Sequence, residues 1–386
     1  HDCTIIPSGR ISVNGSVELK VASKDAVSVG VIMRREDGFV RDCGTFPIQS
    51  GMVCNRTYPN FGNQAGRYVV TVSFLDAAGA VLGVREFPYE LVSTKVTSTQ
   101  MLDGCWVSIC HWSDFESQHF QQGLKSLTAE QWKQKIYSMH KAKITSVLIQ
   151  NVFDSTHYVH QHDMTVETYD GKAFYDSKLY SNRQELACED PIEAILSAAD
   201  ECNMSVFPGV GLFAWFDFSE ESLKWHKNVA LELHQRYGHH KSFYGWYFAC
   251  ELNMEKFRPE HWDKLNRNTL KARELSPAKP ILMSPYCQPG QEFIEYIEKH
   301  DLFDIMMPQD FVGQNRFTLA DSRQQNITLL DYCQKSNKHL WANCEAFNFT
   351  GANVNLAGNG AISLLVPRYK NGGMDGEEGF IQQMET

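Results

Sequence analysis

The sequence predicts an α/β protein, a (β/α)8-type TIM barrel preceded by a small β-sandwich. Two observations support this fold class: residues 1–97 are short alternating segments separated by turns, and from residue 104 apolar runs alternate with amphipathic helical segments. No glycine-rich dinucleotide loop follows the first apolar run, which favours a barrel over an open doubly wound sheet. We therefore expect an immunoglobulin-like β-sandwich domain over 1–97 and a (β/α) barrel catalytic domain over 98–386.

The first of these regions has the pattern of antiparallel strands. Segments 16–21 and 68–74 alternate polar and apolar residues, as strands with one buried face do. Asn-Gly at 14–15 and Asp-Gly at 37–38 are typical hairpin turns. The polar segment 93–99 suits a linker between the two domains.

The barrel strands are predicted from seven apolar runs with helical segments between them. Thr128 and Gln131 form a capping-box pattern at the start of one helix, and Pro191 occupies the first turn of another. After 364–367 the chain runs through closely spaced glycines, with no room for both a helix and a closing strand, so the sequence leaves the presence of the eighth strand open. The predicted strands are 105–112, 145–153, 205–213, 243–252, 280–286, 304–311 and 340–347.

Two glutamates end predicted barrel strands and are the candidate catalytic pair. Active sites of such barrels lie at the carboxyl ends of the strands, where Glu251 ends the fourth run and Glu345 the seventh. Retaining glycosidases use two carboxyl groups about 5–5.5 Å apart, one as acid and base and one as nucleophile. By analogy with barrel glycosidases, Glu251 is the expected acid/base and Glu345 the expected nucleophile. Asp310, at the end of the sixth run, is a third candidate catalytic carboxylate.

Aromatic and amide side chains near the same strand ends are candidate substrate-binding residues. Aromatic residues make up 12% of the chain, and sugar rings stack on their faces. These side chains predict a carbohydrate partner, with a long insertion at 157–180 shaping access to the site. The candidate substrate-binding residues are His111, Trp112, Gln150, Asn151, Trp215, Tyr247, Tyr286, Gln309, Trp341 and Asn343.

Charge and motifs exclude several other classes of function. A formal net charge of -10 disfavours nucleic-acid binding, and no apolar stretch reaches the about 18 residues of a membrane span. The chain has no nucleophile elbow, P-loop or dinucleotide fingerprint. His157, His160, His162 and Asp163 lack a convincing metal-binding pattern, and the pair at 239–240 is weaker still, so we predict no metal and no cofactor.

Cysteine usage and the first residue bear on location. The chain has 11 cysteines, an odd number, and Cys3, Cys43 and Cys54 are placed so that the first hundred residues could hold one disulfide. The sequence begins at His1 rather than at a methionine, as a processed chain does. We therefore expect a secreted, periplasmic or cell-surface protein. The sequence does not determine its oligomeric state.

Four strings in the barrel region carry a family resemblance. They are Trp106-Val107-Ser108-Ile109, Gly245-Trp246-Tyr247 leading to Glu251, Met307-Pro308-Gln309-Asp310 with Gly313, and Trp341-Ala342-Asn343-Cys344-Glu345. With these strings, about residues 100 to 350 resemble the bacterial family known as domain of unknown function 4434. The resemblance implies a barrel glycoside hydrolase with an N-terminal β-domain, and it supports Glu251, Asp310 and Glu345 as site positions. Members usually continue past a helix into a final strand, and this chain departs from them there.

The prediction is therefore a glycoside hydrolase, with a retaining mechanism expected, that acts on an oligo- or polysaccharide. One alternative is a glycan-binding protein that keeps the barrel mouth but has no catalytic activity. Another is a structural assembly protein that uses the barrel as a scaffold.

Overall fold

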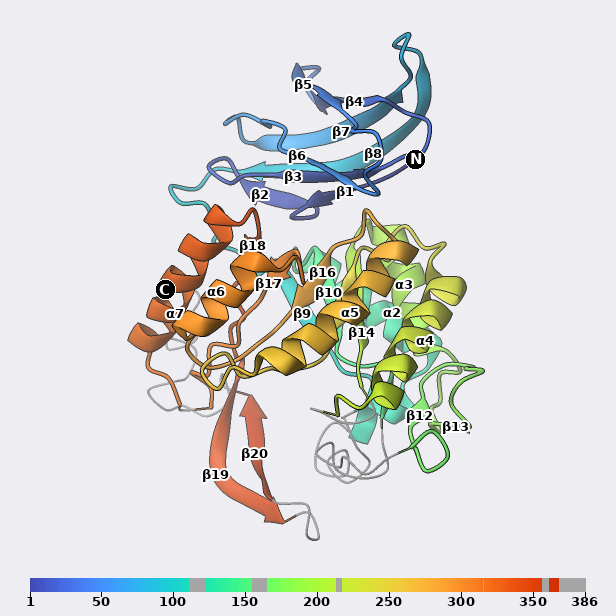
Figure 1. Ribbon diagram of the computed structural model, residues 1–386, viewed down its shortest axis with the longest axis vertical. Helices are drawn as coiled ribbons and strands as arrows, with labels where there is room; N and C mark the ends of the chain where they lie inside the picture. Colours follow the sequence, from blue (N-terminus) through green and yellow to red (C-terminus); the bar gives the residue numbers. More distant parts are fainter. Residues whose placement is uncertain (111–121, 155–164, 213–216, 315, 356–360, 368–386) are drawn as a thin grey trace.

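The computed structural model describes residues 1–110, 122–154, 165–212, 217–314, 316–355 and 361–367, with only the backbone described at 268–270, 347–355 and 361–367. These residues form β-sheets near the N-terminus and, after them, an α/β region built on one parallel sheet (Figure 1).

The N-terminal strands form two sheets that enclose an apolar core. One sheet has the order β1-β3-β6 and the other the order β2-β8-β7-β4-β5. Val31, Val72 and Phe74 are among the buried residues of this core. The predicted β-rich N-terminal region is thus confirmed, whereas the domain boundary at residue 97 stays a prediction. The strands are β1 (Asp2–Ile6), β2 (Arg10–Ser12), β3 (Glu18–Ala22), β4 (Ser28–Arg35), β5 (Val40–Pro47), β6 (Asn55–Thr57), β7 (Gly66–Leu75) and β8 (Val81–Val92).

The α/β region is built on a seven-stranded parallel sheet whose strands lie side by side in chain order. This order is that of successive βα units, and six of the seven predicted runs contain the corresponding strand entirely or nearly so. The strands are β9 (Gly104–Val107), β10 (Ser146–Ile149), β14 (Ser205–Val210), β15 (Trp246–Phe248), β16 (Ile281–Met283), β17 (Ile305–Met306) and β18 (His339–Leu340).

Helices connect these strands, and three short strands form a separate small sheet. Thr128 and Gln131 form the predicted capping box, and Pro191 begins its helix as predicted. The helices are η1 (Gln122–Ser126), α2 (Ala129–Lys141), α3 (Pro191–Cys202), α4 (Glu220–Tyr237), α5 (Pro259–Leu275), α6 (Gln291–Lys299) and α7 (Leu319–Lys335), and the small sheet holds β11 (Phe153–Asp154), β12 (Lys172–Ala173) and β13 (Asn182–Arg183).

The parallel sheet is curled, and side chains of distant strands meet on its inner face. The rings of Trp106 on β9 and Tyr247 on β15 lie 4.9 Å apart. Phe207 on β14 and Trp341 just after β18 lie 5.8 Å apart. Because these pairs bring together the first and fourth strands and the third and seventh, the sheet has the curvature of a half-barrel.

The chain after β18 differs from the predicted barrel strand. The predicted seventh run, 340–347, is only two residues of strand, after which β19 (Phe347–Asn355) and β20 (Ala361–Pro367) form an antiparallel hairpin. The apolar segment 364–367 belongs to this hairpin. Within the described residues no strand joins β18 to β9, and the hairpin projects from the end of the α/β region opposite the N-terminal sheets (Figure 1).

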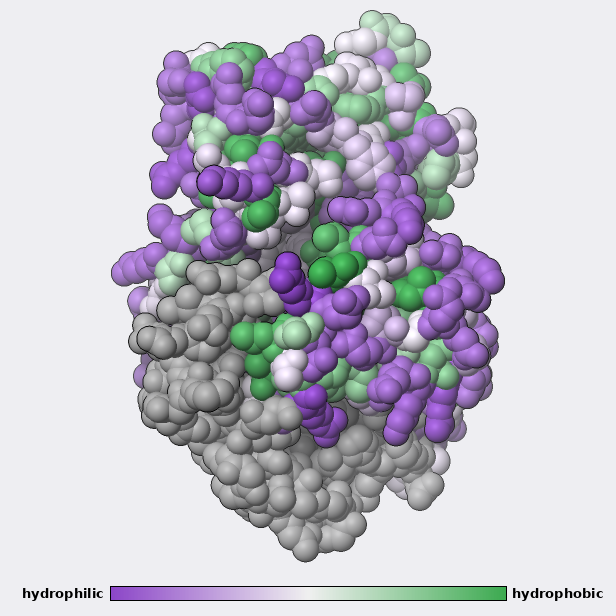
Figure 2. Space-filling view, turned by 90° about the vertical axis from the view of Figure 1, so that its left-hand side faces the viewer, coloured by the Kyte–Doolittle hydropathy of each residue, from purple (hydrophilic) through white to green (hydrophobic). Residues whose placement is uncertain are grey.

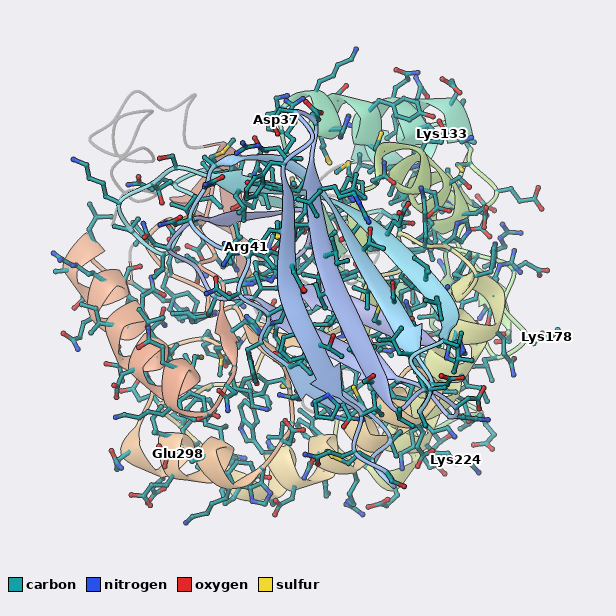
Figure 3. The ribbon with its side chains drawn as sticks, turned by 90° about the horizontal axis from the view of Figure 1, so that it is seen from above. Asp37, Arg41, Lys133, Lys178, Lys224 and Glu298 are labelled. Carbon is teal, nitrogen blue, oxygen red and sulfur yellow. The ribbon has the colours of Figure 1, made fainter. Side chains whose placement is uncertain are left out.

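The N-terminal sheets cover the amino ends of the strands of the parallel sheet. Viewed from above, they lie across the α/β region, and the helices that carry Lys133, Lys224 and Glu298 surround them (Figure 3). Ile6, at the end of β1, is completely buried in the inner cluster of the curled sheet. The Tyr244 hydroxyl donates a hydrogen bond of 2.7 Å to the Ile5 carbonyl and fixes this contact.

A buried group of charges joins the same two parts. Asp304, just before β17, accepts hydrogen bonds from Lys20 at 2.9 Å and from Arg56 at 2.6 Å, both in the N-terminal sheets. Arg273 of α5 lies 3.2 Å from its other oxygen. Burial opposes ionisation of Asp304, but these three cations outweigh it and hold its pKa well below the usual range.

On the face shown in Figure 2, hydrophilic residues predominate among the described residues, with hydrophobic residues between them. Among the described helices, none is both long and apolar enough to cross a membrane. Cys3, Cys43 and Cys54 are free thiols, so none of them forms the disulfide that the first hundred residues could have held. Cys3 is buried and packs as a small hydrophobic side chain, whereas Cys43 and Cys54 are half-buried.

Candidate active site

Strand alternation places Glu251 on the inner face of the curled sheet. Tyr247 on β15 and Ala249 just after it both belong to the inner apolar cluster. Successive side chains of a strand point to opposite faces, so Glu251 continues the inner row at the carboxyl end of β15. A parallel bridge between Asn253 and Tyr286 keeps the fourth and fifth strands together beyond this point. Glu251 is half-buried there.

The surroundings of Glu251 favour its protonated form. Burial raises its pKa to about 7, and a hydrogen bond with the side chain of Gln309 lowers it only in part. The phenols of Tyr247 and Tyr286 lie close enough for the Glu251 charge to add to the effect of burial, which raises the pKa of both. Glu251 therefore lies among three of the predicted substrate-binding residues.

Glu345 is placed by the inner row of the seventh strand. Trp341 packs against the inner cluster, and Asn343 forms a parallel bridge with Gln309 of the sixth strand. Glu345 is the next residue of that row, and it is only 6% exposed. Gln314 holds its carboxylate, because the Gln314 backbone N–H donates to one oxygen at 3.0 Å and the side-chain amide to the other at 2.7 Å.

Asp310 lies directly against Glu345. One Asp310 oxygen accepts the backbone N–H of Glu345 at 3.3 Å and that of Val312 at the same distance. Burial and the negative charge of Asp310 raise the pKa of Glu345 to about 7, against the opposing effect of the Gln314 hydrogen bonds. Gln309 and Asp310 are consecutive, so one segment at the end of the sixth strand contacts both glutamates.

Two further candidates, at the end of β10, have different environments. Gln150 is half-buried beside the strand end. Asn151 is 1% exposed, and its amide donates a hydrogen bond of 2.5 Å to the Phe153 carbonyl. This bond shapes the chain locally, so Asn151 contributes to the turn, while its buried oxygen has no hydrogen-bond partner among the described residues. Other expectations lie outside the described residues: His111, Trp112, Trp215 and the group at 157–163.

Sequence reasoning missed Gln314. It does not end an apolar run, and it contacts Glu345 only because the loop after β17 folds back toward β18. The signal available was its place next to Gly313, four residues after Asp310 in the loop that follows the sixth strand. The described residues contain one group of possible metal ligands, and it belongs to α3 and the turn before β15 rather than to this site.

Residues 102–359 match the family described as domain of unknown function DUF4434, which is more than half of the chain. The chain belongs to this family. The resemblance predicted from the strand-end strings is thereby confirmed, and Glu251, Asp310 and Glu345 all lie inside the matched region. No curated protein sequence matches the chain.

Several solved β-glucuronidases share a weak structural similarity with the chain, which spans about half the length of each. The FMN-binding enzyme from Faecalibacterium prausnitzii L2-6 has 12% identity, coverage of 89% of this chain and 48% of its own, and a TM-score of 0.39. Another β-glucuronidase from Faecalibacterium prausnitzii is 14% identical to this chain, covers 93% of it and 53% of its own length, and has a TM-score of 0.40. That from Dictyoglomus thermophilum is 14% identical, covers 89% of this chain and 54% of its own length, and has a TM-score of 0.35. At these scores the similarity carries no argument about catalysis.

Proposed function

We propose that the protein is a retaining glycoside hydrolase that uses Glu251 and Glu345. The observation that carries this proposal is that Glu251 follows β15 and Glu345 follows β18 at the carboxyl ends of one curled parallel sheet, and that the pKa of both is raised to about 7. A carboxyl group with a pKa near the working pH can donate a proton in one step and accept one in the next. Glycosidic bond cleavage requires such a group beside a second carboxylate.

The different surroundings of the two glutamates support the division of roles. Glu251 has one amide neighbour, Gln309, and burial favours its neutral form, which suits the general acid. Both oxygens of Glu345 accept hydrogen bonds from Gln314, which oppose burial and the Asp310 charge and favour the ionised form that a nucleophile needs. Asp310 holds the Glu345 backbone and is a positioning residue in this proposal.

The reaction then follows the two-step retaining course. Glu251 protonates the glycosidic oxygen while Glu345 attacks the anomeric carbon, so the bond to the leaving group breaks as a glycosyl ester forms on Glu345. In the second step Glu251 removes a proton from water, whose oxygen attacks the same carbon and releases Glu345 as a carboxylate.

Half-buried aromatic rings beside the two glutamates support a carbohydrate substrate. Tyr286 lies near Glu251, and Trp341 precedes Glu345 on the same inner row. Such rings stack on the apolar faces of sugars, so we propose an oligo- or polysaccharide substrate. A polysaccharide substrate fits the secreted, periplasmic or cell-surface location that we propose for the protein.

The test is a screen of aryl glycosides and defined polysaccharides, with the anomeric form of the first product followed by NMR. We expect retention, and we expect Glu251→Gln and Glu345→Gln to lower kcat by about 10²–10⁴-fold with folding intact. Glu255→Gln is the matched control, because Glu255 is exposed in the next loop. A product with inverted anomeric configuration would contradict the role of Glu345 as nucleophile. Saturable glycan binding without turnover would favour the non-catalytic alternative.

A further inference from the structure

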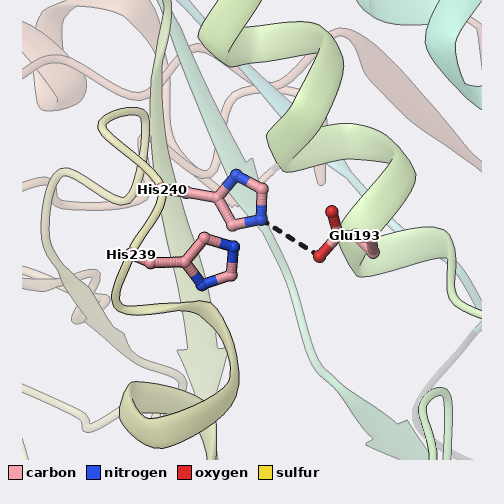
Figure 4. A group of neighbouring side chains, drawn as sticks. All are labelled: Glu193, His239 and His240. Atoms are coloured by element: carbon pink, nitrogen blue, oxygen red, sulfur yellow. Dashed lines mark hydrogen bonds and ion pairs between the residues drawn. The ribbon is translucent and has the colours of Figure 1, made fainter.

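His240 is held in one orientation by a carboxylate on each side of its ring. Its Nδ1 lies 2.7 Å from an Asp200 oxygen, and its Nε2 lies 3.0 Å from Oε2 of Glu193 (Figure 4). Both carboxylates come from α3, two turns apart, and His240 lies in the turn that follows α4. His240 is 6% exposed, so its ring has little freedom to turn away.

The hydrogen-bond pattern leaves a place for a cation between His240 and Glu193. When Nδ1–H donates to Asp200, Nε2 of a neutral imidazole is an acceptor, and Glu193 Oε2 is also an acceptor. Two acceptors 3.0 Å apart repel each other unless a positive charge lies between them. That charge is either a second proton on the ring or a metal ion.

A third ligand atom is already close. His239 is exposed, and its ring lies 4.2 Å from that of His240, centroid to centroid. One ligand atom from each of His239, His240 and Glu193 can be chosen so that all lie within 4.8 Å of one another. Figure 4 shows both rings and the carboxylate gathered between α3 and the turn before β15.

The distance between the His240 and Glu193 ligand atoms is close to that of a tetrahedral zinc site. With zinc bonds of about 2.0–2.1 Å, two ligand atoms of a tetrahedron lie about 3.3 Å apart. The 3.0 Å between His240 and Glu193 requires a shift of a few tenths of an ångström, and His239 is exposed and can move toward them. Ser197 donates to Oε1 of Glu193 at 2.8 Å, which orients the carboxylate and leaves Oε2 for the metal.

Asp200 has the position of an outer carboxylate in a metal site. Metal-bound histidines usually donate their other ring N–H to such a group, which fixes the tautomer and raises the basicity of the ligand. Asp200 is itself held, because its other oxygen accepts the Ser242 backbone N–H at 2.7 Å.

We propose that Glu193, His239 and His240 bind one Zn²⁺ ion, with Asp200 orienting His240. Nitrogen and carboxylate ligands in this combination suit zinc, and water completes the four-coordinate shell. The ion replaces the second proton of His240 and joins α3 to the turn between α4 and β15. This site is independent of the proposed glycosidase activity.

Zinc titration of the full, chelator-treated chain tests the site. Cysteine thiols elsewhere can also bind zinc, so the quantity compared is the difference between the wild type and each variant. We expect His239→Ala and Glu193→Gln each to lose one equivalent of zinc, or to bind it at least tenfold more weakly. Asp200→Asn should weaken the same equivalent by about 10–100-fold. His140→Ala, an exposed histidine on α2, is the matched control and should behave as wild type.

A second readout separates ligands from folding. Zinc should raise the thermal midpoint of the wild type and of His140→Ala, but not that of His239→Ala, while the three zinc-free midpoints agree. Cobalt bound at the site should show the visible bands of nitrogen and oxygen ligands without a thiolate charge-transfer band. Equal zinc stoichiometry and affinity in wild type and His239→Ala would overturn the proposal and leave a proton as the only cation between His240 and Glu193.

Discussion

The side-chain amide of Gln314 lies 2.7 Å from one carboxylate oxygen of Glu345, and the Gln314 backbone N–H lies 3.0 Å from the other. These two donors oppose the effects of burial and of Asp310, both of which raise the pKa of Glu345. The charge state of Glu345 is therefore set by a balance that substitutions can shift in either direction.

Removal of the amide should make Glu345 harder to ionise. In Gln314→Ala the side-chain donor is lost and the backbone donor remains, so the pKa of Glu345 should rise above about 7. The acid limb of the kcat/KM profile should move to higher pH, with a loss of about tenfold at pH 6. Gln324→Ala, an exposed glutamine of α7, is the control. An unmoved acid limb would show that Gln314 does not tune Glu345.

Neutralisation of Asp310 should have the opposite effect. Asp310→Asn keeps an oxygen that can accept the Glu345 backbone N–H but removes the charge that raises the pKa of Glu345. The acid limb should therefore move to lower pH, by about one pH unit at most. The pH profile of kcat/KM for Asp310→Asn is measured with the same substrate as that for Gln314→Ala, so that the two shifts can be compared directly. If both variants shift the limb in one direction, the electrostatic balance described here is wrong.

Glu251 should reduce stability at alkaline pH. Its folded pKa of about 7 lies above the ordinary 4.5, so folding favours the protonated form. The associated stability is fully present below about pH 4.5 and is lost as pH rises through about 7. Glu251→Gln should be more stable than wild type at pH 8 by on the order of 2 kcal/mol, with little gain at pH 4.5. Urea unfolding at the two pH values measures this, and equal gains at both would contradict it.

The buried charges around Asp304 should matter far more than an exposed ion pair. Asp304→Asn leaves Lys20, Arg56 and Arg273 without their shared carboxylate, and we expect a loss of about 3–5 kcal/mol in the free energy of unfolding. The matched control is Asp331→Asn, which breaks the exposed pair with Lys335 and should cost under about 1 kcal/mol. Similar losses in the two variants would mean that burial does not amplify the Asp304 contacts.

The same carboxylate should give a pH dependence of its own. Its cationic neighbours hold the pKa of Asp304 well below the ordinary value, so this stability is present above pH 4 and is lost as pH falls through the depressed pKa. The difference in stability between wild type and Asp304→Asn should therefore be constant from pH 5 to 7 and shrink in stronger acid. A difference that persists unchanged to pH 2 would contradict this.

Local sequence patterns predicted the helices and strands well, because the spacing of apolar residues and the helix-capping residues depend only on neighbouring positions. The alternation of polar and apolar residues located the N-terminal strands, and the capping box of Thr128 and Gln131 located the start of α2. Strand-end position also selected Glu251, Asp310 and Glu345, and the structure brings Asp310 and Glu345 together. Their catalytic role stays a prediction.

Contacts between distant segments could not be predicted in this way. Lys20 and Asp304 are separated by 284 positions, and nothing in the neighbourhood of either shows that they pair. Gln314 acts on Glu345 through the path of a loop, which no periodicity records. Cys43 and Cys54 flank a plausible connection, but the spacing of cysteines does not by itself bring two sulfur atoms together.

Ile6 has a consequence for how the molecule unfolds. Its side chain fills the inner cluster of the curled sheet, although it belongs to the first strand of the chain. Separation of the N-terminal sheets from the α/β region would leave an apolar cavity in the α/β region and an exposed isoleucine on the N-terminal sheets. A state in which only one of the two parts is folded is therefore high in free energy. The N-terminal sheets and the α/β region should melt in a single calorimetric transition, and protease cuts within 93–99 should leave the fragments associated.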